Sequence, residues 1–334
     1  MRASKNRQSE DSMEGQANVL QMKVEFEDFE LFQSFSKDWT TDFRQLKPGV
    51  NISTLQQVFT QNVIFAKCHF SNLITQQGES PKGYRSFAML DETSTPISWR
   101  YLPVEQHQLM VFPKDGDFSC VSQKDFTVFP FSIHESFLES LSHSIFDRGW
   151  EEIMDDEGHV MQLPNKYAKK IQQVLCTMSQ VGEWFREDPV QLSVVWHRLD
   201  LDNQLGRALL EGISHKDIFK LSPKVNNRSL LIKRSLDLLN SVRLDDITAS
   251  QMAELVGTSQ STLERTFKDH FTMAPKAYVK AMRLHEVRKD LIQHNNKFYK
   301  VTDVANKYGF WHMGQFASDY RKLFGRLPSE DRLL

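Results

Sequence analysis

Polar and charged side chains recur at steps of three and four in the stretch QSTLERTFKDHF, residues 260–271. On an α-helix this spacing places them on one face. Hydroxyl, carboxylate, guanidinium and ammonium groups can contact base edges and phosphates in a DNA major groove, which is wide enough for one α-helix. The side chains on this face are Ser261, Glu264, Arg265 and Lys268. Their types and spacing predict a helix that contacts nucleic acid.

A second stretch near the C-terminus repeats the same skeleton. Residues 301–328 align with residues 248–275, and Gly309 matches Gly257 at an offset of 52. The apolar positions are kept and the polar ones change, as expected for one supersecondary unit used twice. Gln315 is of the type that pairs with adenine, but its neighbours are small, so this helix is expected to dock mainly through backbone and phosphate contacts. The outward candidates are Met313, Gln315, Ser318, Arg321 and Lys322.

Each of these helices needs a partner helix that positions it. In the first copy, SQMAELVG predicts an apolar-stepped helix that ends at Gly257, and Ser259 is the expected N-cap of the next helix. Leu263, Phe267 and Phe271 are spaced by four and would hold that second helix by its inner face. The sequence therefore predicts two helix-turn-helix units, one in each copy.

The two copies are separated by a helical stretch, PKAYVKAMRLHEVRKDLIQ, residues 275–293. A helix of this length is ~28 Å long, because each residue adds about 1.5 Å. Successive major grooves recur every ~34 Å on one face of B-DNA. The two second helices are therefore expected to reach consecutive major grooves.

The charge distribution separates the two ends of the chain. The whole chain has a net charge of −2. From Val225 onward there are 18 Lys and Arg against 12 Asp and Glu, a net charge of +6, whereas residues 1–224 carry −8. A basic final third suits a polyanionic partner, and the acidic remainder would be repelled by one. Nucleic-acid binding is therefore expected in the C-terminal part.

Length and composition indicate a globular chain of two or more domains. Of its 334 residues, 40% are hydrophobic and 25% are charged. No apolar run approaches the ~20 residues that span a bilayer, and the polar first residues lack the apolar segment of a secretory signal. The scattered cysteines, Cys68, Cys120 and Cys176, favour a reducing compartment over a disulfide or zinc site. The chain is therefore expected in the cytoplasm, without a membrane partner.

The residue patterns of common enzyme sites are missing from the sequence. The eleven histidines show no His-x-His or His-x-x-x-His pair for a metal. There is no glycine-rich phosphate loop and no Gly-x-Ser-x-Gly nucleophile elbow. We therefore expect no catalytic residue, no metal and no cofactor.

The first 220 residues predict a β-rich domain with flanking helices. Residues 1–22 are polar and are expected to form a disordered tail. Aromatic residues at 26, 29, 32, 35, 39 and 43 step by three or four and predict one face of a helix. Short β-type runs between residues 50 and 131 predict a sandwich or a cupin-like barrel. Helical periodicity then returns at about residues 132–147, 166–186 and 190–221.

The polar, proline-containing stretch LSPKVNNRS, residues 221–229, is the expected domain boundary. The predicted organisation is a tail at 1–22, a sensing or dimerisation domain at 23–220, a linker at 221–229, and a DNA-binding domain at 230–334 with its units at about 249–271 and 301–324. The fold class is thus α+β in two domains, β-rich at the N-terminus and all-α at the C-terminus.

Four side chains of the β-rich region are candidates for lining a ligand pocket. Aromatic residues in short strands usually pack in the core, which is the alternative for this set. The ligand-binding residues are therefore left open. The candidates are His69, Trp99, Tyr101 and His107.

About the last hundred residues resemble the DNA-binding domain of AraC/XylS-type bacterial transcription regulators. The shared features occur in order: two helix-turn-helix units, Arg283-Leu284 in the connecting helix, Gly309-Phe310 in the second unit, and the closing Gly-x-x-Pro that ends at Pro328. The stretch GFWHMGQFASDY is also similar to the ethanolamine-utilisation regulators of this family. The sequence departs from the family at Thr272, where glycine is usual.

The resemblance implies site residues by their position in the family's pattern. The implied base-contacting set is Ser261, Glu264, Arg265, Met313, Gly314, Gln315 and Ser318. Phosphate contacts are expected from hydroxyl, basic and histidine side chains on the same units and on the connecting helix. This second set is Ser259, Thr262, Lys268, Lys276, Lys280, His312, Arg321 and Lys322. Solvated surface charge is the alternative for the basic residues, and capping or packing is the alternative for His312.

The resemblance also implies a function and partners. The expected protein is a sequence-specific transcription regulator, an activator, that binds double-stranded promoter or operator DNA and contacts RNA polymerase. A small-molecule or protein effector would act on the N-terminal domain, which in this family often dimerises, so a homodimer is one candidate assembly and the oligomeric state is left open. Two alternatives stay open: a β-barrel enzyme fused to a DNA-tethering domain, and a regulator whose N-terminal domain binds a protein in place of a small molecule.

Overall fold

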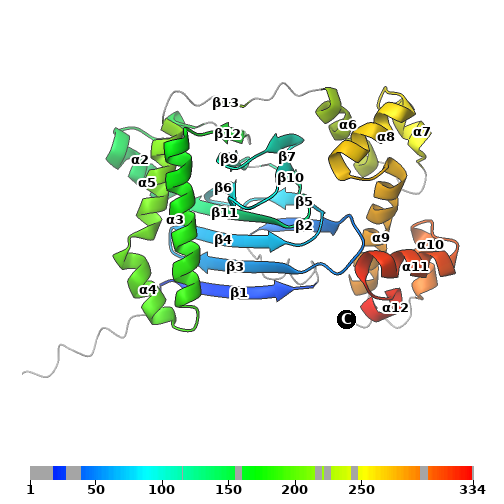
Figure 1. The fold of residues 1–334 in the computed structure, drawn as a ribbon, viewed down its shortest axis with the longest axis horizontal. Coiled ribbons are helices and arrows are strands. Elements are labelled where there is room, and N and C mark those ends of the chain that lie inside the picture. The colour runs from blue at the N-terminus through cyan, green and yellow to red at the C-terminus, as the bar shows by residue number, and fades with distance from the viewer. Residues whose placement is uncertain are drawn as a thin grey trace, which may run out of the picture.

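The computed structural model describes residues 18–27, 39–114, 116–154, 160–214, 220–221, 227–241, 247–293 and 300–332. Two sheets and a group of helices make up the N-terminal part, and helices alone make up the described C-terminal part (Figure 1). The predicted fold class is therefore confirmed.

Two antiparallel sheets form the N-terminal part. One has the strand order β1-β3-β4-β11-β6-β9-β12-β13, and the other has the order β2-β5-β10-β7-β8. Many strands are rich in β-branched and aromatic residues, as in VIFAKCHF of β4, which suit a pleated surface. The strands are β1 (Leu20–Phe26), β2 (Thr40–Gln45), β3 (Ser53–Phe59), β4 (Val63–Phe70), β5 (Ile74–Glu79), β6 (Tyr84–Leu90), β7 (Ile97–Trp99), β8 (Leu102–Val104), β9 (Gln108–Val111), β10 (Phe118–Val121), β11 (Phe126–His134), β12 (Val160–Gln162) and β13 (Lys220–Leu221).

The larger sheet separates two apolar cores. Side chains such as Phe70 and Phe126 pack between the two sheets, and their stacked rings have centroids 5.0 Å apart. Side chains such as Phe65 and Phe131 face the other way and pack against helices. Those helices are α2 (Glu135–Phe146), α3 (Asn165–Trp184), α4 (Pro189–Arg198) and α5 (Leu201–Ser214), with the short 3-10 turn η1 (Trp150–Glu152) beside them.

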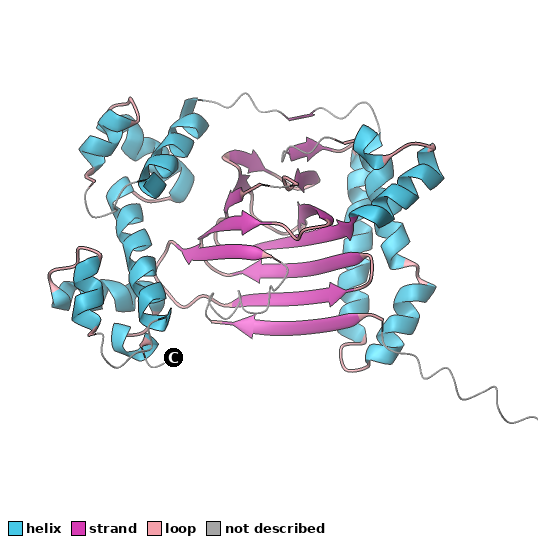
Figure 2. Ribbon diagram, turned by 180° about the vertical axis from the view of Figure 1, so that it is seen from behind, coloured by secondary structure: helices cyan, strands magenta, loops and turns pink. Residues whose placement is uncertain are grey.

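The C-terminal helices lie beyond the opposite end of the strands. Figure 2 shows the two groups of helices on either side of the sheets. The long helix α9 has one helix-turn-helix unit near each of its ends (Figure 1). The C-terminal helices are α6 (Asn227–Ser241), α7 (Ala249–Leu255), α8 (Gln260–Phe271), α9 (Pro275–Gln293), α10 (Val301–Lys307), α11 (Met313–Phe324) and α12 (Pro328–Asp331).

The predictions for the first 45 residues are wrong where the structure describes them. Residues 20–22, expected in a disordered tail, pair with β3 as the start of β1. The predicted helix at 26–43 is contradicted at both ends, because Phe26 closes β1 and Phe43 lies in β2. Both rings are buried between the sheets, so strand pairing overrides a spacing that also fits a helix. The rest of the tail, 1–17, and the aromatic positions 29, 32 and 35 lie outside the described residues.

Several boundaries also differ from the prediction. Strand β11 continues to His134, so α2 begins three residues after the expected start at 132. The helical expectation for 190–221 fails at its end, where residues 220–221 form β13. The expected linker 221–229 is helical from Asn227, and the Ser229 hydroxyl in the first turn of α6 donates to the Tyr101 carbonyl oxygen at 2.8 Å.

The two parts of the molecule touch through both helix-turn-helix units. The His285 imidazole on α9 donates from Nε2 to the backbone carbonyl oxygen of Gln45, 2.8 Å away, and this bond is buried. The Gln45 side chain in turn donates to the Leu323 carbonyl oxygen at the end of α11, at 2.9 Å. Near the first unit, the rings of Tyr101 and His270 have centroids 6.2 Å apart. The β-rich part therefore contacts the unit at each end of α9.

We expect acid to weaken the folded protein through His285. Burial lowers the pKa of this imidazole to about 3, and the charges around it are Arg44, Arg288 and Asp42. The unfolded chain takes up a proton below its ordinary pKa of about 6.5, while the folded protein does not. The free energy of unfolding should therefore fall as pH drops from about 6.5 toward 3, by up to about 1.4 kcal/mol per pH unit.

Urea unfolding between pH 7 and pH 5 measures this dependence. His270, whose pKa burial lowers to about 4, contributes in the same direction. His285→Gln keeps a donor for the Gln45 carbonyl and should reduce the slope, whereas His197→Gln, at an exposed position on α4, should leave it unchanged. An unchanged slope in His285→Gln would contradict the assignment.

Candidate nucleic-acid interface

The first helix-turn-helix unit is built by two capped helices around a tight turn. Thr248 and Gln251 form a reciprocal capping box at the start of α7. Gly257 supplies the left-handed backbone of the turn with a φ of +77°. The Ser259 hydroxyl then accepts from the Thr262 amide at 3.2 Å and starts α8. These local signals fix where α8 begins and which side chains it presents.

Helix α8 presents the predicted polar face to solvent. Leu263, Phe267 and Phe271 are fully buried on its inner side, as the spacing predicted. The Glu264 carboxylate is half-buried and accepts from the Gln260 amide at 2.9 Å. Thr262 is also half-buried, within the first turn. The exposed side chains that the structure brings together are Ser259, Ser261, Arg265 and Lys268.

The other flank of α8 is already occupied by protein. Thr266, Asp269 and His270 line a recess against β7 and α6, and Asp269 pairs with Arg228 of α6 at 3.3 Å. Arg265 lies one turn before Asp269 and so borders this recess, but it does not line it and, like Ser261 and Lys268, it stays exposed. The contact with the β-rich part therefore leaves the predicted DNA-contacting face of α8 exposed.

Helix α11 repeats this arrangement with smaller side chains. Phe316, Tyr320 and Leu323 are buried on its inner side. Met313, expected to point outward, is half-buried and packs against the same core, because it lies on the inner side of the first turn. The remaining predicted residues of α11 are exposed together: Gly314, Gln315, Ser318, Arg321 and Lys322.

A groove of about 880 Å³ runs between the two units along α9. Trp311, which was not predicted as a contact residue, also lines this groove, and its side chain is 71% exposed. The only signal for this residue in the sequence is its position, as a large aromatic residue directly before a predicted helix. Lys280 forms an ion pair with Asp319 of α11 at 3.0 Å, which holds α11 against α9. The predicted contact residues that line the groove are Lys276, Lys280, His312 and Gln315.

A buried polar network fixes the end of the second unit. The Asp331 carboxylate is fully buried and accepts from Arg288 of α9 at 3.0 Å and from the Tyr320 hydroxyl of α11 at 2.6 Å. Breaking a buried pair of this kind leaves an uncompensated charge, which costs about 3–5 kcal/mol. The network therefore locks α11 and α12 onto the connecting helix.

The β-rich part holds a small apolar cavity of about 80 Å³ between its two sheets. Of the four candidate pocket residues, Trp99 lines it. Tyr101 lies at the contact with α6 and α8, and His69 is 2.9 Å from the Thr127 hydroxyl. His107 is not among the described residues that line the cavity. The sequence thus indicated one of the lining side chains.

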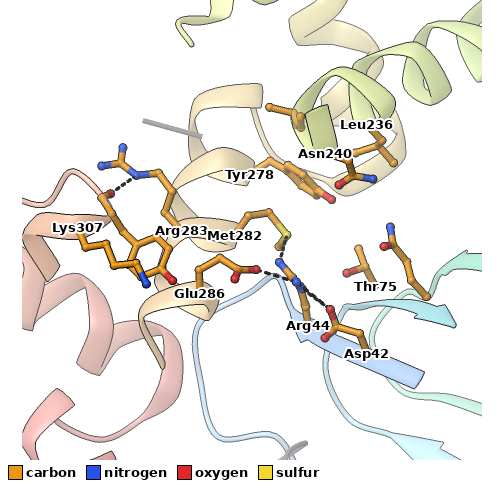
Figure 3. Close-up of a pocket in the computed structure, with 13 residues that line it drawn as sticks. Asp42, Arg44, Thr75, Leu236, Asn240, Tyr278, Met282, Arg283, Glu286 and Lys307 are labelled. Atoms are coloured by element: carbon orange, nitrogen blue, oxygen red, sulfur yellow. Dashed lines mark hydrogen bonds and ion pairs between the residues drawn. The ribbon is translucent and has the colours of Figure 1, made fainter. Parts of the chain in front are cut away.

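A second pocket, of about 480 Å³, lies between the β-rich part and the helices (Figure 3). Asp42 and Arg44 reach it from β2, and Tyr278, Met282 and Glu286 reach it from α9. The Arg44 guanidinium lies 2.8 Å from both Asp42 and Glu286. This pocket was not predicted from the sequence, because the aromatic spacing over 26–43 indicated a helix where β2 begins.

The described residues contain no group of three or more His, Cys, Asp and Glu side chains that could hold a metal ion. No helix within the described ranges is long and apolar enough to cross a bilayer.

Comparison with known proteins matches the C-terminal part of the chain. A family model described as a helix-turn-helix domain matches residues 252–333. The chain is 28% identical over 168 residues to the probable thc operon regulatory protein of Rhodococcus erythropolis, covering 40% of this chain and 51% of that protein. It is 38% identical over 85 residues to a XylDLEGF operon transcriptional activator 1 of Pseudomonas putida, covering 25% of this chain and 26% of that protein.

Among solved structures, the AraC-like transcriptional activator CuxR is 11% identical and aligns with a TM-score of 0.40, covering 81% of this chain and 96% of CuxR. The chain spans about half of the first curated relative and about a quarter of the second. The C-terminal part is a helix-turn-helix domain of the AraC/XylS type, and the resemblance predicted from the sequence is confirmed for this part.

Thr272 has a backbone conformation that favours glycine. It caps the end of α8 with a φ of 56°, and the corresponding position in the second unit is Gly325, with a φ of 75°. A β-branched residue is strained there. Thr272→Gly should therefore raise the free energy of unfolding by about 1 kcal/mol, measured by urea denaturation. Thr177→Gly, in the middle of α3, should lower it slightly. If the Thr272→Gly protein were no more stable than its parent, Thr272 would not be strained in the folded protein.

Proposed function

We propose that this protein is a sequence-specific DNA-binding transcription regulator, an activator whose C-terminal domain reads promoter DNA. The observation that carries the proposal is the pair of second helices, α8 and α11, that each expose a polar face. Both are held by one connecting helix and anchored by buried aromatic side chains. The names of the curated relatives, which are operon regulators and activators, support the same function.

Helix α8 supplies most of the base contacts in this proposal. Arg265 is exposed and can form two hydrogen bonds with one guanine. Ser261 lies one turn before it and suits several bases. Glu264 already accepts from Gln260, so its contact with a cytosine amino group requires exchange of that bond.

Helix α11 adds affinity through close approach to the DNA backbone. A Cβ at Gly314 would meet nothing within 4 Å, so packing gives no reason for glycine there. Glycine inside a helix costs about 1 kcal/mol relative to alanine. A glycine in the first turn has no side chain, so a phosphate of the DNA backbone can come close to the helix there. Gln315 and Ser318 flank that position on the exposed side.

Basic side chains around these helices would hold the phosphates. Lys268, Arg321 and Lys322 are exposed on the second helices, and Lys276 lies at the start of α9. Lys280 would exchange Asp319 for a phosphate. Such contacts supply affinity that depends on salt but carry no sequence information.

Control comes from an effector bound in the N-terminal domain, and the cavity between the two sheets is the proposed site. Effector binding could alter DNA binding through the linker near 221–229 or through a homodimer interface. The direct contacts of β2 with α9 offer a shorter path from the cavity to the DNA-binding helices. Bound at a promoter in the bacterial cytoplasm, the protein would present its remaining surface to RNA polymerase.

Selection of random duplex DNA by the full-length protein tests this function. We expect enrichment of a motif that spans two successive major grooves, with affinity that falls steeply as salt rises. The same selection is run with residues 225–334 alone, because a requirement for bound effector would prevent DNA binding only by the full-length protein. If neither the full-length protein nor the fragment enriched a motif, the proposal would be refuted.

Arg265→Ala should weaken binding to the selected site by about 1–3 kcal/mol and relax the base preference at one position. The measurement is a titration of labelled cognate and scrambled duplexes. Arg198→Ala removes another exposed arginine, on α4 in the N-terminal part, and should change the affinity for neither duplex. Equal losses of DNA affinity in the two variants would show that Arg265 does not contact the DNA.

A further inference from the structure

Four of the twelve buried side-chain atoms that have no hydrogen-bond partner among the described residues belong to residues that line the cavity between the sheets. Trp99 and Gln57 are 2% and 3% exposed, and both line the cavity. Within the described structure, Trp99 Nε1, Gln57 Oε1, Gln76 Nε2 and Thr41 Oγ1 find no hydrogen-bond partner. An unpaired buried polar group costs about 1–3 kcal/mol. Four of them around one apolar cavity indicate that a bound molecule supplies their partners.

The hydrogen-bonding character of these atoms restricts that molecule. The Trp99 indole can only donate, and a glutamine amide offers both a donor and an acceptor. The Thr41 hydroxyl can do either. An ammonium group cannot accept from Trp99, and a carboxylate cannot donate to a glutamine carbonyl. A group with both an acceptor and a donor, such as a primary amide or a hydroxyl, fits the whole set.

The cavity offers no charge to balance an ionic ligand. None of the described residues that line it is charged. Cys68 and Cys120 also line it, and burial raises the pKa of each thiol to about 12, so both stay neutral. The nearby Arg44 belongs to the pocket on the other side of β2. An unpaired ion would therefore lose its hydration without compensation, which costs several kcal/mol.

The rings and the volume of the cavity also limit the ligand. Trp99, Phe112 and Phe118 contact one another, with ring centroids 4.5 to 5.4 Å apart, so they do not form an open cage for an ammonium group. A water molecule occupies ~30 Å³ of liquid. About 80 Å³ therefore accommodates a molecule of only a few non-hydrogen atoms.

We propose that the effector is a small uncharged molecule with an apolar body and one amide or hydroxyl group, bound between the sheets by Gln57, Gln76, Thr41 and Trp99. The inference rests on the regulatory function proposed above and specifies its ligand. It is tested by binding in the absence of DNA, so its failure is distinct from failure of the DNA selection.

Three molecules of similar size and different charge test the proposal on the full chain: propionamide, propionate and propylammonium. Propionamide in the tens of millimolar should raise the Tm and change the fluorescence of the cavity tryptophans, while the two ions should do neither. A Tm rise with an ion as large as with propionamide would overturn the proposal. No response to propionamide would also overturn it, and would leave water as the occupant.

Gln57→Leu and Gln76→Leu separate recognition from stability. Each should weaken propionamide binding by about tenfold, the value of one hydrogen bond of roughly 1.4 kcal/mol. Each should leave the ligand-free Tm unchanged or raised, because an unpaired polar group is replaced by an apolar one. Gln77→Leu, the next residue of β5, lines the other pocket and should keep full affinity. Unaltered affinity in both Gln57→Leu and Gln76→Leu would refute the site.

A separate observation concerns how β2 connects this cavity to the DNA-binding helices. Side chains alternate along a strand. Thr41 and Phe43 line the cavity, whereas Asp42 and Arg44 line the pocket against α9 (Figure 3). The paired strand β5 follows the same alternation, with Gln76 opposite Phe43 on the cavity side. Two adjacent strands therefore form the wall between the cavity and the pocket.

We infer that β2 transmits the state of the cavity to α9. Arg44 pairs with Glu286 at 2.8 Å, and the next residue, Gln45, bonds to both α9 and α11. A ligand that pairs with Thr41 shifts β2 against these contacts. The connecting helix then changes its position relative to the sheets, and with it the spacing of the two units.

Glu286→Gln tests the transmission because it removes the ion pair and nearly preserves the shape. Propionamide should change the DNA affinity of the parent protein, and this change should shrink to within twofold in the variant, while the Tm rise with propionamide persists. Glu183→Gln breaks a 2.8 Å ion pair with Lys23 on the far side of the β-rich part and should respond like the parent. A full response in Glu286→Gln, or none in the parent, would overturn the inference.

Discussion

The contact between β2 and α9 is the constraint on which the two halves of the molecule depend. The buried bond from His285 to the Gln45 carbonyl satisfies a ring nitrogen and a backbone oxygen at once. Neither group could lose its partner without a desolvation penalty. Because α9 carries a helix-turn-helix unit near each end, whatever fixes α9 also fixes the separation of α8 and α11. The two helix-turn-helix units are thus held against β2, the edge strand of the smaller sheet, by a few hydrogen bonds and ion pairs.

Much of the helical part can be predicted from the sequence because its signals are local and occur twice. Ser259, Gly257 and the four-residue spacing of Leu263 and Phe267 each act within one or two turns, and the second copy repeats the pattern. The strained Thr272 departs from that pattern, and its φ of 56° shows that the backbone keeps the shape that glycine supports in the second unit. Neighbouring packing, and not the residue itself, sets this conformation.

The interface with the β-rich part could not be predicted in the same way. Strand β2 is only six residues long, TTDFRQ, and its partner β5 begins 29 residues further along the chain. Nothing local marks Arg44 as the partner of Glu286, because the two residues lie in different parts of the chain, on β2 and α9. The aromatic spacing around Phe26 and Phe43 also fits two structures equally well until sheet pairing decides between them. Residue periodicity within one element does not predict contacts between residues far apart in the sequence, and the contacts between β2 and α9 are of that kind.

The unpaired polar atoms in the sheet core are informative because a stable protein has no structural need for them. Leucine at position 57 would fill similar space between the sheets without a buried oxygen, and the Gln56 side chain, one residue away on the opposite face, has partners in Ser179. The same residue type in the same strand is therefore satisfied on the structural face and unsatisfied on the cavity face. Local rules are usually broken where function requires it. That contrast, on one strand and within two residues, is the strongest reason to regard the cavity as a binding site and not as a packing defect.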